Sequence, residues 1–181
     1  MACLWANIDD YLKTLIETAY TVEVEVPPEE EGGEPTTQQV KTLTCVVGEQ
    51  LDPDNHQLPV CLIRGYESEM GDAEYPFMDG AYHIDGIAYP YELIVIDADD
   101  AYADIKDKMT EHGAKVRDVI RSVPAFGGLS GESAAPGAGV ERVQRVDIGN
   151  MTLYVRGRAG QNKACKYVGA AALQIAVVSQ I

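Results

Sequence analysis

The chain has 181 residues, of which 46% are hydrophobic and 24% are charged, a mixture typical of one folded globular domain rather than a disordered tail. A domain of this size buries roughly 70% of the surface that its unfolded chain exposes, so it needs no disulfide or metal to hold a core. The formal net charge of -15 argues against a protein that binds nucleic acid or anionic membranes, because such partners attract basic surfaces.

The first elements follow clear periods. Apolar residues recur at steps of three and four, which predicts an amphipathic helix over Leu4–Thr18. Strict alternation over Tyr20–Val26 predicts a half-buried strand whose three valines face the core. The stretch Glu29–Pro35 is acidic and rich in glycine and proline, which predicts a mobile loop.

The middle of the chain continues with strands and one more helix. Apolar runs predict strands over Val40–Val47, Leu58–Arg64 and Tyr91–Asp97, and four consecutive apolar residues in the last indicate burial on both sheet faces. The acidic cluster Asp97–Asp100 favours a helix start, because carboxylates accept bonds from unpaired amides there. An apolar stripe over Ile105–Val123 predicts the helix itself.

The last third begins with an expected loop. Five glycines and two prolines over 124–139 predict an exposed, pliable connection of unusual length. Strands follow over Glu141–Ile148, Thr152–Arg158 and Val168–Ser179, with a hairpin turn at Gly149-Asn150. We therefore predict a single α+β domain over 1–181, a mainly antiparallel sheet covered by two helices, with an extra β-hairpin and long loops.

The charge is divided unevenly along the chain. Residues 1–100 carry 3 basic and 22 acidic side chains, and residues 101–181 carry 11 basic and 7 acidic, so the halves hold -19 and +4, which together give -15. This division suits copies that meet head to tail, the acidic surface of one against the basic surface of the next. Two differently solvated faces of a monomer explain it equally well.

The cysteines and the N-terminus indicate a reduced, unexported protein. Cys3, Cys45, Cys61 and Cys165 lie far apart, form no CxxC motif and adjoin apolar runs, which predicts buried, reduced thiols. No basic segment followed by an apolar stretch opens the chain, so we expect no export signal and a cytoplasmic protein.

No pattern for catalysis or cofactor binding stands out. The string Gly128–Ser133 misses the GxSxG nucleophile motif by one position. We expect His56, His83 and His112 to be solvated or capping, since none has a second histidine at ligand spacing. Glycine pairs lie between a helix and a strand, not between a strand and a helix, so no phosphate cradle is indicated. The sequence thus predicts no catalytic residue, metal or cofactor.

Tyrosine is unusually frequent. The chain has ten tyrosines against two phenylalanines, and five of them lie within 26 residues: Tyr66, Tyr75, Tyr82, Tyr89 and Tyr91. A tyrosine ring buries apolar area while its hydroxyl tolerates water, which suits protein interfaces. An amphipathic surface on a monomer is the alternative.

Four segments share a pattern with one family: the helix over Leu4–Thr18, the strand entered through a proline at Leu58–Gly65, the passage Tyr91–Asp97 into the second helix, and the closing strand Ala172–Val178. In this order they resemble the tail terminator proteins of long-tailed bacteriophages, particularly the lambdoid kind. The segments cover about half of the chain. The acidic insertion 29–37 and the 124–140 loop depart from the family pattern and leave open a related neck or head-tail joining protein.

The resemblance implies a virion protein of the tail or neck, assembled in the host cytoplasm and without catalytic activity. It implies a homohexameric ring that docks on the tail tube protein, ends tail growth and offers a surface to the head connector. Six copies at -15 each would carry -90, and a channel of that charge would let DNA pass without binding it.

Candidate partner-interface residues come from the acidic insertion, the tyrosine stretch, the long loop and the basic strand after it: Glu29, Glu30, Glu31, Tyr66, Tyr75, Tyr82, Phe126, Leu129, Arg142 and Arg145. Two other functions stay open. One is an acidic DNA mimic that inhibits a host protein, which the net charge suits but the +4 second half does not. The other is a small enzyme in which His56 or His83 would lie beside Ser130.

Overall fold

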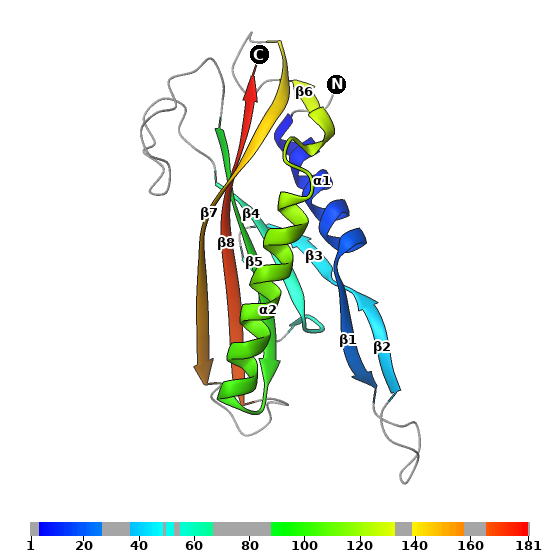
Figure 1. The fold of residues 1–181 in the computed structure, drawn as a ribbon, viewed down its shortest axis with the longest axis vertical. Helices are drawn as coiled ribbons and strands as arrows, with labels where there is room; N and C mark the ends of the chain where they lie inside the picture. Colours follow the sequence, from blue (N-terminus) through cyan, green and yellow to red (C-terminus); the bar gives the residue numbers. More distant parts are fainter. Residues whose placement is uncertain are drawn as a thin grey trace.

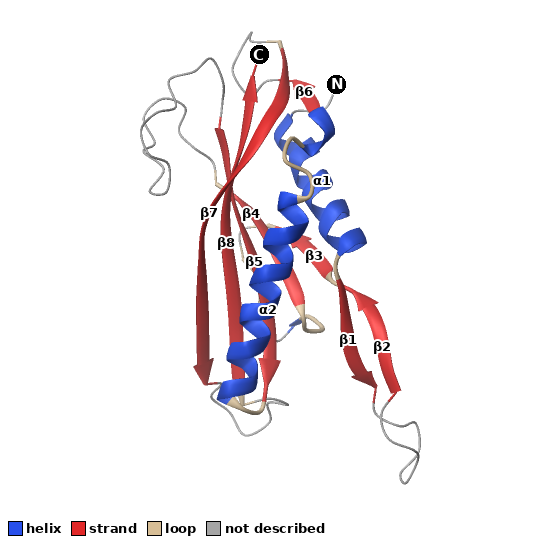
Figure 2. Cartoon of the chain, viewed as in Figure 1, coloured by secondary structure: helices blue, strands red, loops and turns tan. Residues whose placement is uncertain are grey.

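The protein combines two helices with a six-stranded, curled, mostly antiparallel sheet and a separate two-stranded sheet (Figures 1 and 2). This architecture confirms the predicted α+β class. The computed structural model describes residues 4–26, 37–48, 50–52, 55–66, 88–132, 139–157 and 166–180, and only the backbone of 21–26 and 37–42.

The elements occur in the chain order α1 (Leu4–Ala19), β1 (Thr21–Val26), β2 (Thr37–Thr42), β3 (Thr44–Val47), β4 (Val60–Gly65), β5 (Ala88–Asp99), α2 (Tyr102–Arg121), β6 (Ser130–Glu132), β7 (Val140–Gly157) and β8 (Tyr167–Gln180).

The main sheet has the strand order β3-β4-β5-β8-β7-β6. Every neighbouring pair is antiparallel except β3 and β4, which are parallel. Both helices lie on the same side of the sheet (Figure 2). Because the sheet curls, α1 contacts both of its edge strands, β3 and β6, while α2 packs across β5, β8 and β7. The result is a half-barrel whose hollow side the two helices fill.

The helices bury the stripes that their periodicity predicts. The apolar side chains that α1 buries are Leu4, Ile8, Leu12 and Ile16, and those of α2 are Ile105, Met109, Val116 and Ile120. All eight are at most 1% exposed. Burying one such side chain stabilises the fold by about 1.5–3 kcal/mol relative to leaving it exposed, so these stripes hold the helices on the sheet.

Strand β5 is covered on both faces, as its apolar run predicts. Leu93 and Val95 belong to the core under α1 and α2. Ile96 is buried on the opposite face, where Ile94 and Leu58 pack into a second, smaller cluster. The segment that leads into β4 therefore covers part of the sheet face that no helix covers.

Two predicted boundaries are wrong. The run Val40–Val47 is two strands, because Leu43 interrupts it and its N–H donates to the Tyr20 carbonyl oxygen at 3.1 Å. The part before Leu43 is β2, which pairs with β1 to form a two-stranded sheet that we call the arm. The arm projects away from the body (Figure 1). Whether the valines of β1 face a core lies outside the described side chains.

The predicted hairpin turn at Gly149-Asn150 is also wrong, because both residues lie inside the continuous strand β7. The register against β8 shifts between Ile148 and Met151, where two residues of β7 lie opposite one of β8, so one extra residue forms a β-bulge. The extra β-hairpin of this fold is therefore the arm and not the two segments around Gly149.

The start of α2 differs from the predicted carboxylate cap. Asp97 and Asp99 lie in β5, and the residue that precedes the helix, Ala101, makes no side-chain cap. Asp99 still accepts the Ala101 N–H at 3.2 Å and forms an ion pair with Lys108 at 2.5 Å between Oδ2 and Nζ. The acidic cluster fastens the β5–α2 turn without capping the helix.

Candidate interaction surfaces

The charge division along the sequence is only partly carried by the described strands. Strand β5 has three acidic residues and no basic one, and β1 of the arm has two glutamates against one lysine in β2. Strand β7 has three arginines against Glu141 and Asp147. Five basic residues of the second half lie on α2, which packs across the middle of the sheet. In Figure 1 the arm and β7 lie on opposite sides of the body.

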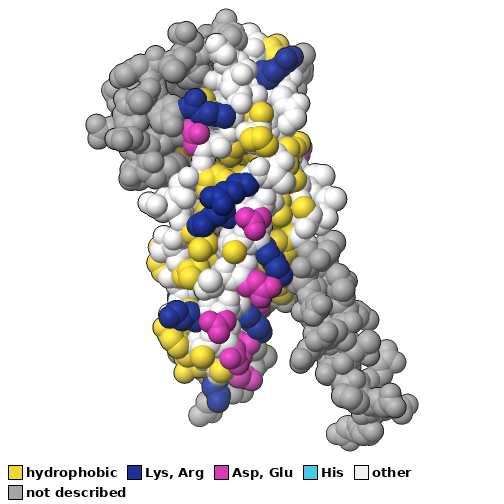
Figure 3. Space-filling view, in the orientation of Figure 1, with side chains coloured by type: hydrophobic (Ala, Val, Ile, Leu, Met, Phe, Trp, Pro, Cys, Tyr) yellow, Lys and Arg dark blue, Asp and Glu magenta, His cyan; other side chains and the backbone are white. Residues whose placement is uncertain are grey.

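The helix-covered face carries both signs of charge. Basic and acidic side chains alternate along it in Figure 3. On α2, Lys115 and Glu111 form an ion pair with 2.6 Å between Nζ and Oε1, and this bond lowers the pKa of Glu111. An exposed pair of this kind contributes little to stability. The visible face is therefore mixed in charge.

Two candidate arginines lie on β7. Arg142 is exposed and pairs in register with Ser130 of β6. Arg145 is half-buried, and its Nε lies 3.0 Å from Oδ2 of Asp147 on the same strand. Both candidates lie on the same strand, and Arg142 has the more exposed side chain of the two.

Phe126 is the candidate that the structure moves into the core. The side chain is 1% exposed and its ring stacks on Tyr11 of α1 with 4.8 Å between centroids. Left-handed backbone at Gly127 and Gly128, with φ of 64° and 73°, turns the chain tightly here. Leu129 is half-buried against the same cluster. This part of the predicted pliable loop is therefore anchored, and Phe126 is not available to a partner.

Tyr66 is exposed and belongs to a small charged cluster. Its ring is 39% exposed and its hydroxyl donates to Oε2 of Glu92 at 2.7 Å. The guanidinium of Arg64, which pairs with Glu92, lies 4.9 Å from the ring centroid. Partial burial and the bond to Glu92 raise the pKa of Tyr66. The cluster holds an aromatic ring in a fixed position at the surface, which suits a protein contact.

Two other members of the tyrosine stretch serve the core. Tyr89 and Tyr91 are each 1% exposed. Their hydroxyls donate to buried or half-buried carboxylates, Tyr89 to Glu141 at 2.7 Å and Tyr91 to Asp9 at 2.9 Å. These tyrosines bury a ring and satisfy a hydroxyl inside the subunit. Five candidates lie outside the described residues: Glu29, Glu30, Glu31, Tyr75 and Tyr82.

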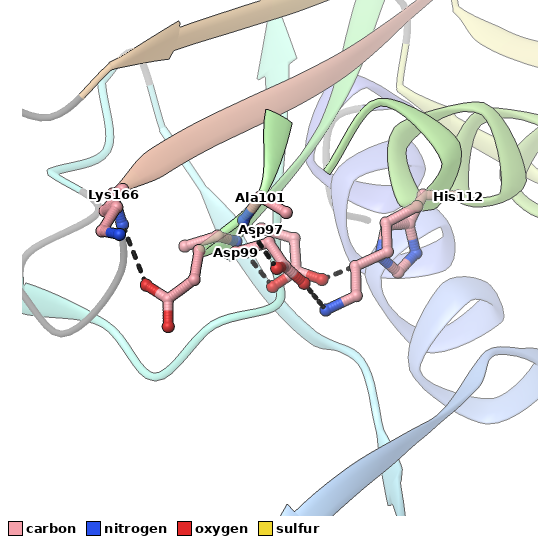
Figure 4. A network of polar contacts seen from close by, with 8 residues as sticks. Asp97, Asp99, Ala101, His112 and Lys166 are labelled. Atoms are coloured by element: carbon pink, nitrogen blue, oxygen red, sulfur yellow. Dashed lines mark hydrogen bonds and ion pairs between the residues drawn. The ribbon is translucent and has the colours of Figure 1, made fainter. Parts of the chain in front are cut away.

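A buried histidine, predicted from the sequence to be solvated or capping, joins α2 and β5 to Tyr20, the residue between α1 and β1. His112 of α2 is 8% exposed and shares a hydrogen bond through Nδ1 with the hydroxyl of Tyr20. Its Nε2 lies 3.2 Å from Oδ2 of Asp97, a residue of β5 (Figure 4). A neutral ring that accepts from Tyr20 and donates to Asp97 satisfies both contacts. Since His112 lies three residues after Met109 in the apolar stripe, the sequence did contain the signal for its burial.

The same network continues towards β8. The backbone N–H of Lys166 donates to Oδ1 of Asp100 at 3.3 Å (Figure 4). These bonds join the end of β5 to the start of β8 and to α2. In the described part of the chain, no three His, Cys, Asp or Glu side chains come together as a metal site would require. The network therefore orders the turn between strand and helix.

Two of the four cysteines are described, and both are free and buried as predicted. Cys45 and Cys61 face each other in register on β3 and β4. The contact with Cys45, together with burial, raises the pKa of the Cys61 thiol, so this thiol is less reactive than an exposed one. Cys3 and Cys165 lie outside the described residues.

Neither described helix is long and apolar enough to cross a membrane. No protein-family model and no curated protein matches this sequence.

Proposed function

We propose that this protein is a structural subunit of a phage tail terminator: copies form a ring that caps the tail tube, ends its growth and presents a docking surface to the head connector. The subunit acts by shape and charge complementarity and carries out no chemistry.

The observation that carries this proposal is that the arm, with Glu23 and Glu25 on β1, and strand β7, with its three arginines, lie on opposite sides of the body (Figure 1). An interface between unlike surfaces passes from copy to copy and closes into a ring when the rotation allows it. Complementary charge speeds the encounter and selects the partner. A subunit with glutamates on its arm and arginines on β7 has what such an interface needs.

The segments that resemble tail terminators also support the proposal. They form α1, β4, the passage from β5 into α2, and the closing strand β8, and the two helices lie together on one side of the sheet. This order is the one that the resemblance predicts. Fold alone does not assign function, so a direct assay must decide.

The test is growth of tail tubes. Tube protein encoded next to this chain's gene is polymerised with increasing amounts of the purified chain, and tube lengths are measured by electron microscopy. We expect shorter tubes with the chain bound at one end. Unchanged tube lengths with no chain at tube ends would refute the proposal, and displacement of DNA from a basic host protein would favour the DNA-mimic alternative.

A matched pair of variants sharpens the assay. Tyr66→Ala removes an exposed ring from the candidate interface, and we expect weaker capping, because interface aromatics carry a large share of binding energy. Tyr102→Ala removes a ring that is 55% exposed at the start of α2, outside the candidate set, and capping should persist.

A further inference from the structure

One stretch of sheet edge carries no partner strand in the described structure. Residues 151–157 of β7 pair with β8 on one side, for example Leu153 with Ala171. On the other side, β6 pairs only with Val140, Glu141 and Arg142 of β7. In Figure 1 this lower half of β7 forms the margin of the sheet. An edge of this kind presents backbone N–H and C=O groups that can pair with another strand.

The edge lacks most of the devices that discourage pairing. Proteins usually protect an edge with charges, prolines or bulges, whereas 151–157 has no proline and a single charged residue, Arg156. The register is regular from Met151 onwards, after the bulge. Tyr154 is 60% exposed in the middle of the stretch, and Thr152 is exposed beside it. Thr, Tyr and Val favour strands, so the stretch is well suited to accept one.

The arm has the complementary features. It is a two-stranded sheet separate from the main one, and its strand β1 has six residues against the seven of the open edge. A lone two-stranded sheet is marginally stable in water and gains from further pairing. Strand β1 carries Glu23 and Glu25 and no basic residue, whereas the open edge carries Arg156 and no acidic residue. The two segments match in length and are opposite in charge.

We infer that the arm of one copy adds to the open edge of β7 on the next copy. The arm and the open edge lie on opposite sides of the subunit (Figure 1), so the arm of one copy does not pair with the open edge of that same copy. Each copy instead donates an arm on one side and accepts an arm on the other, which is the heterologous arrangement that closes rings. The inference rests on the proposed function, because only a ring requires such a contact between copies. It identifies the two segments through which neighbouring subunits of that ring meet.

The test uses photo-crosslinking in the purified full-length protein. Tyr154→p-benzoylphenylalanine places a reactive group at the open edge, and a 1:1 mixture of heavy-isotope and ordinary copies separates crosslinks between copies from those within one. We expect mixed-isotope crosslinks that join Tyr154 to the arm over 21–42. The matched control is Tyr102→p-benzoylphenylalanine, a tyrosine of similar exposure at the start of α2, which should give no crosslink to the arm.

Charge exchange gives a second readout. Arg156→Glu should weaken self-association by about tenfold, since it replaces an attraction with a repulsion. Adding Glu23→Lys and Glu25→Lys to the same chain should restore it. Lys106→Glu makes the same charge change at an exposed site on α2 and should have no such effect. Association is measured by sedimentation at low salt.

Each result decides between outcomes. A protein that remains monomeric at all concentrations, crosslinks confined to other segments, or a charge exchange that fails to restore association would overturn the inference. Tube capping by a monomeric protein would overturn the inference and leave the proposed function standing. Arm crosslinks without any capping of tubes would retain the subunit contact and refute the terminator function.

Discussion

Gly169→Ala tests whether α2 packs on β8 as closely as the structure shows. A methyl group at Gly169 would lie 2.5 Å from Cγ of Met109 and 2.8 Å from Cγ1 of Ile105, both on α2. Carbon atoms in contact prefer about 3.5–4.0 Å, so helix and strand must separate by roughly 1 Å. Both partners are fully buried, which leaves them little room to move.

The expected cost follows from two opposing terms. Forcing one methyl group into a packed core costs about 1–3 kcal/mol, while replacing a strand glycine with alanine recovers about 0.5–1 kcal/mol of backbone entropy. Taking the middle of each range, we expect a net loss of about 1 kcal/mol in the free energy of unfolding. For a domain of this length the melting temperature should fall by roughly 2–4 °C.

Urea unfolding and calorimetry measure both quantities. Gly157→Ala is the control, since a methyl group there has nothing within 4 Å, and its effect should stay within about 0.5 kcal/mol. Combining Gly169→Ala with Met109→Ala should cost less than the two changes added together, because the shortened side chain leaves room for the methyl. A Gly169→Ala protein as stable as the original, or strict additivity with Met109→Ala, would refute the close-packing argument.

Three further changes probe α2 and the buried polar groups. Helix propensity alone predicts that Gly113→Ala stabilises the protein by about 1 kcal/mol, but the new methyl would clash with Sδ of Met151, so we expect destabilisation in thermal unfolding. In a protein that already carries Met151→Ala, the same change should stabilise relative to Met151→Ala alone. Tyr20→Phe removes the hydroxyl bonded to the buried histidine of α2 and should cost about 1–3 kcal/mol at pH 7 in urea unfolding. Burial and nearby carboxylates raise the pKa of Tyr20 above its ordinary value of 10. The neutral hydroxyl therefore stabilises the fold below about pH 10, and this stabilisation is lost as the pH rises further. Tyr20→Phe should flatten the alkaline fall in stability, and an unchanged fall would contradict this. Glu141→Leu leaves two buried hydroxyls without their acceptor and should cost about 1–3 kcal/mol by calorimetry, whereas exposed Gln144→Leu should change little.

Where one period dominates a segment, the sequence predicts the element closely. The apolar stripe of α1 and the alternation of β8 end within a residue or two of the observed bounds. These patterns succeed because a single buried face decides each of them. The α+β class followed from their order, and the two helices do cover one side of a mainly antiparallel sheet.

Errors arise where a distant partner decides the local structure. Gly149-Asn150 has the composition of a tight turn, but β8 offers a continuous partner, so the chain stays extended and accommodates one extra residue as a bulge. Leu43 continues an apolar run, and the break there depends on the chain leaving the arm to enter the main sheet. Glycines around Phe126 suggested pliability, whereas their left-handed backbone fixes a turn that directs the ring onto Tyr11.

The candidate interface was predictable only in its broad outline. The uneven charge along the chain was visible from the first count, and its place in space depends on the strand order, which no local pattern reveals. Tyr66 and Tyr89 lie in the same tyrosine-rich stretch, yet one is exposed and the other buried. The strand direction and the neighbour across the sheet decide between these outcomes, and both are properties of the whole fold.

The position of β8 decides how far the charges of its two neighbouring strands lie from each other. This strand lies between β5, whose charged residues are all acidic, and β7, which has three arginines and two carboxylates, and it contains no charged residue itself. Two strand spacings of about 4.8 Å separate β5 from β7, which is close to the Debye length of about 10 Å at 0.1 M ionic strength. Attraction between side chains of β5 and β7 is therefore partly screened across the exposed sheet surface. Oppositely charged side chains in direct contact lie within about 4 Å and interact much more strongly. The uncharged β8 thus keeps the acidic residues of β5 out of direct contact with the arginines of β7.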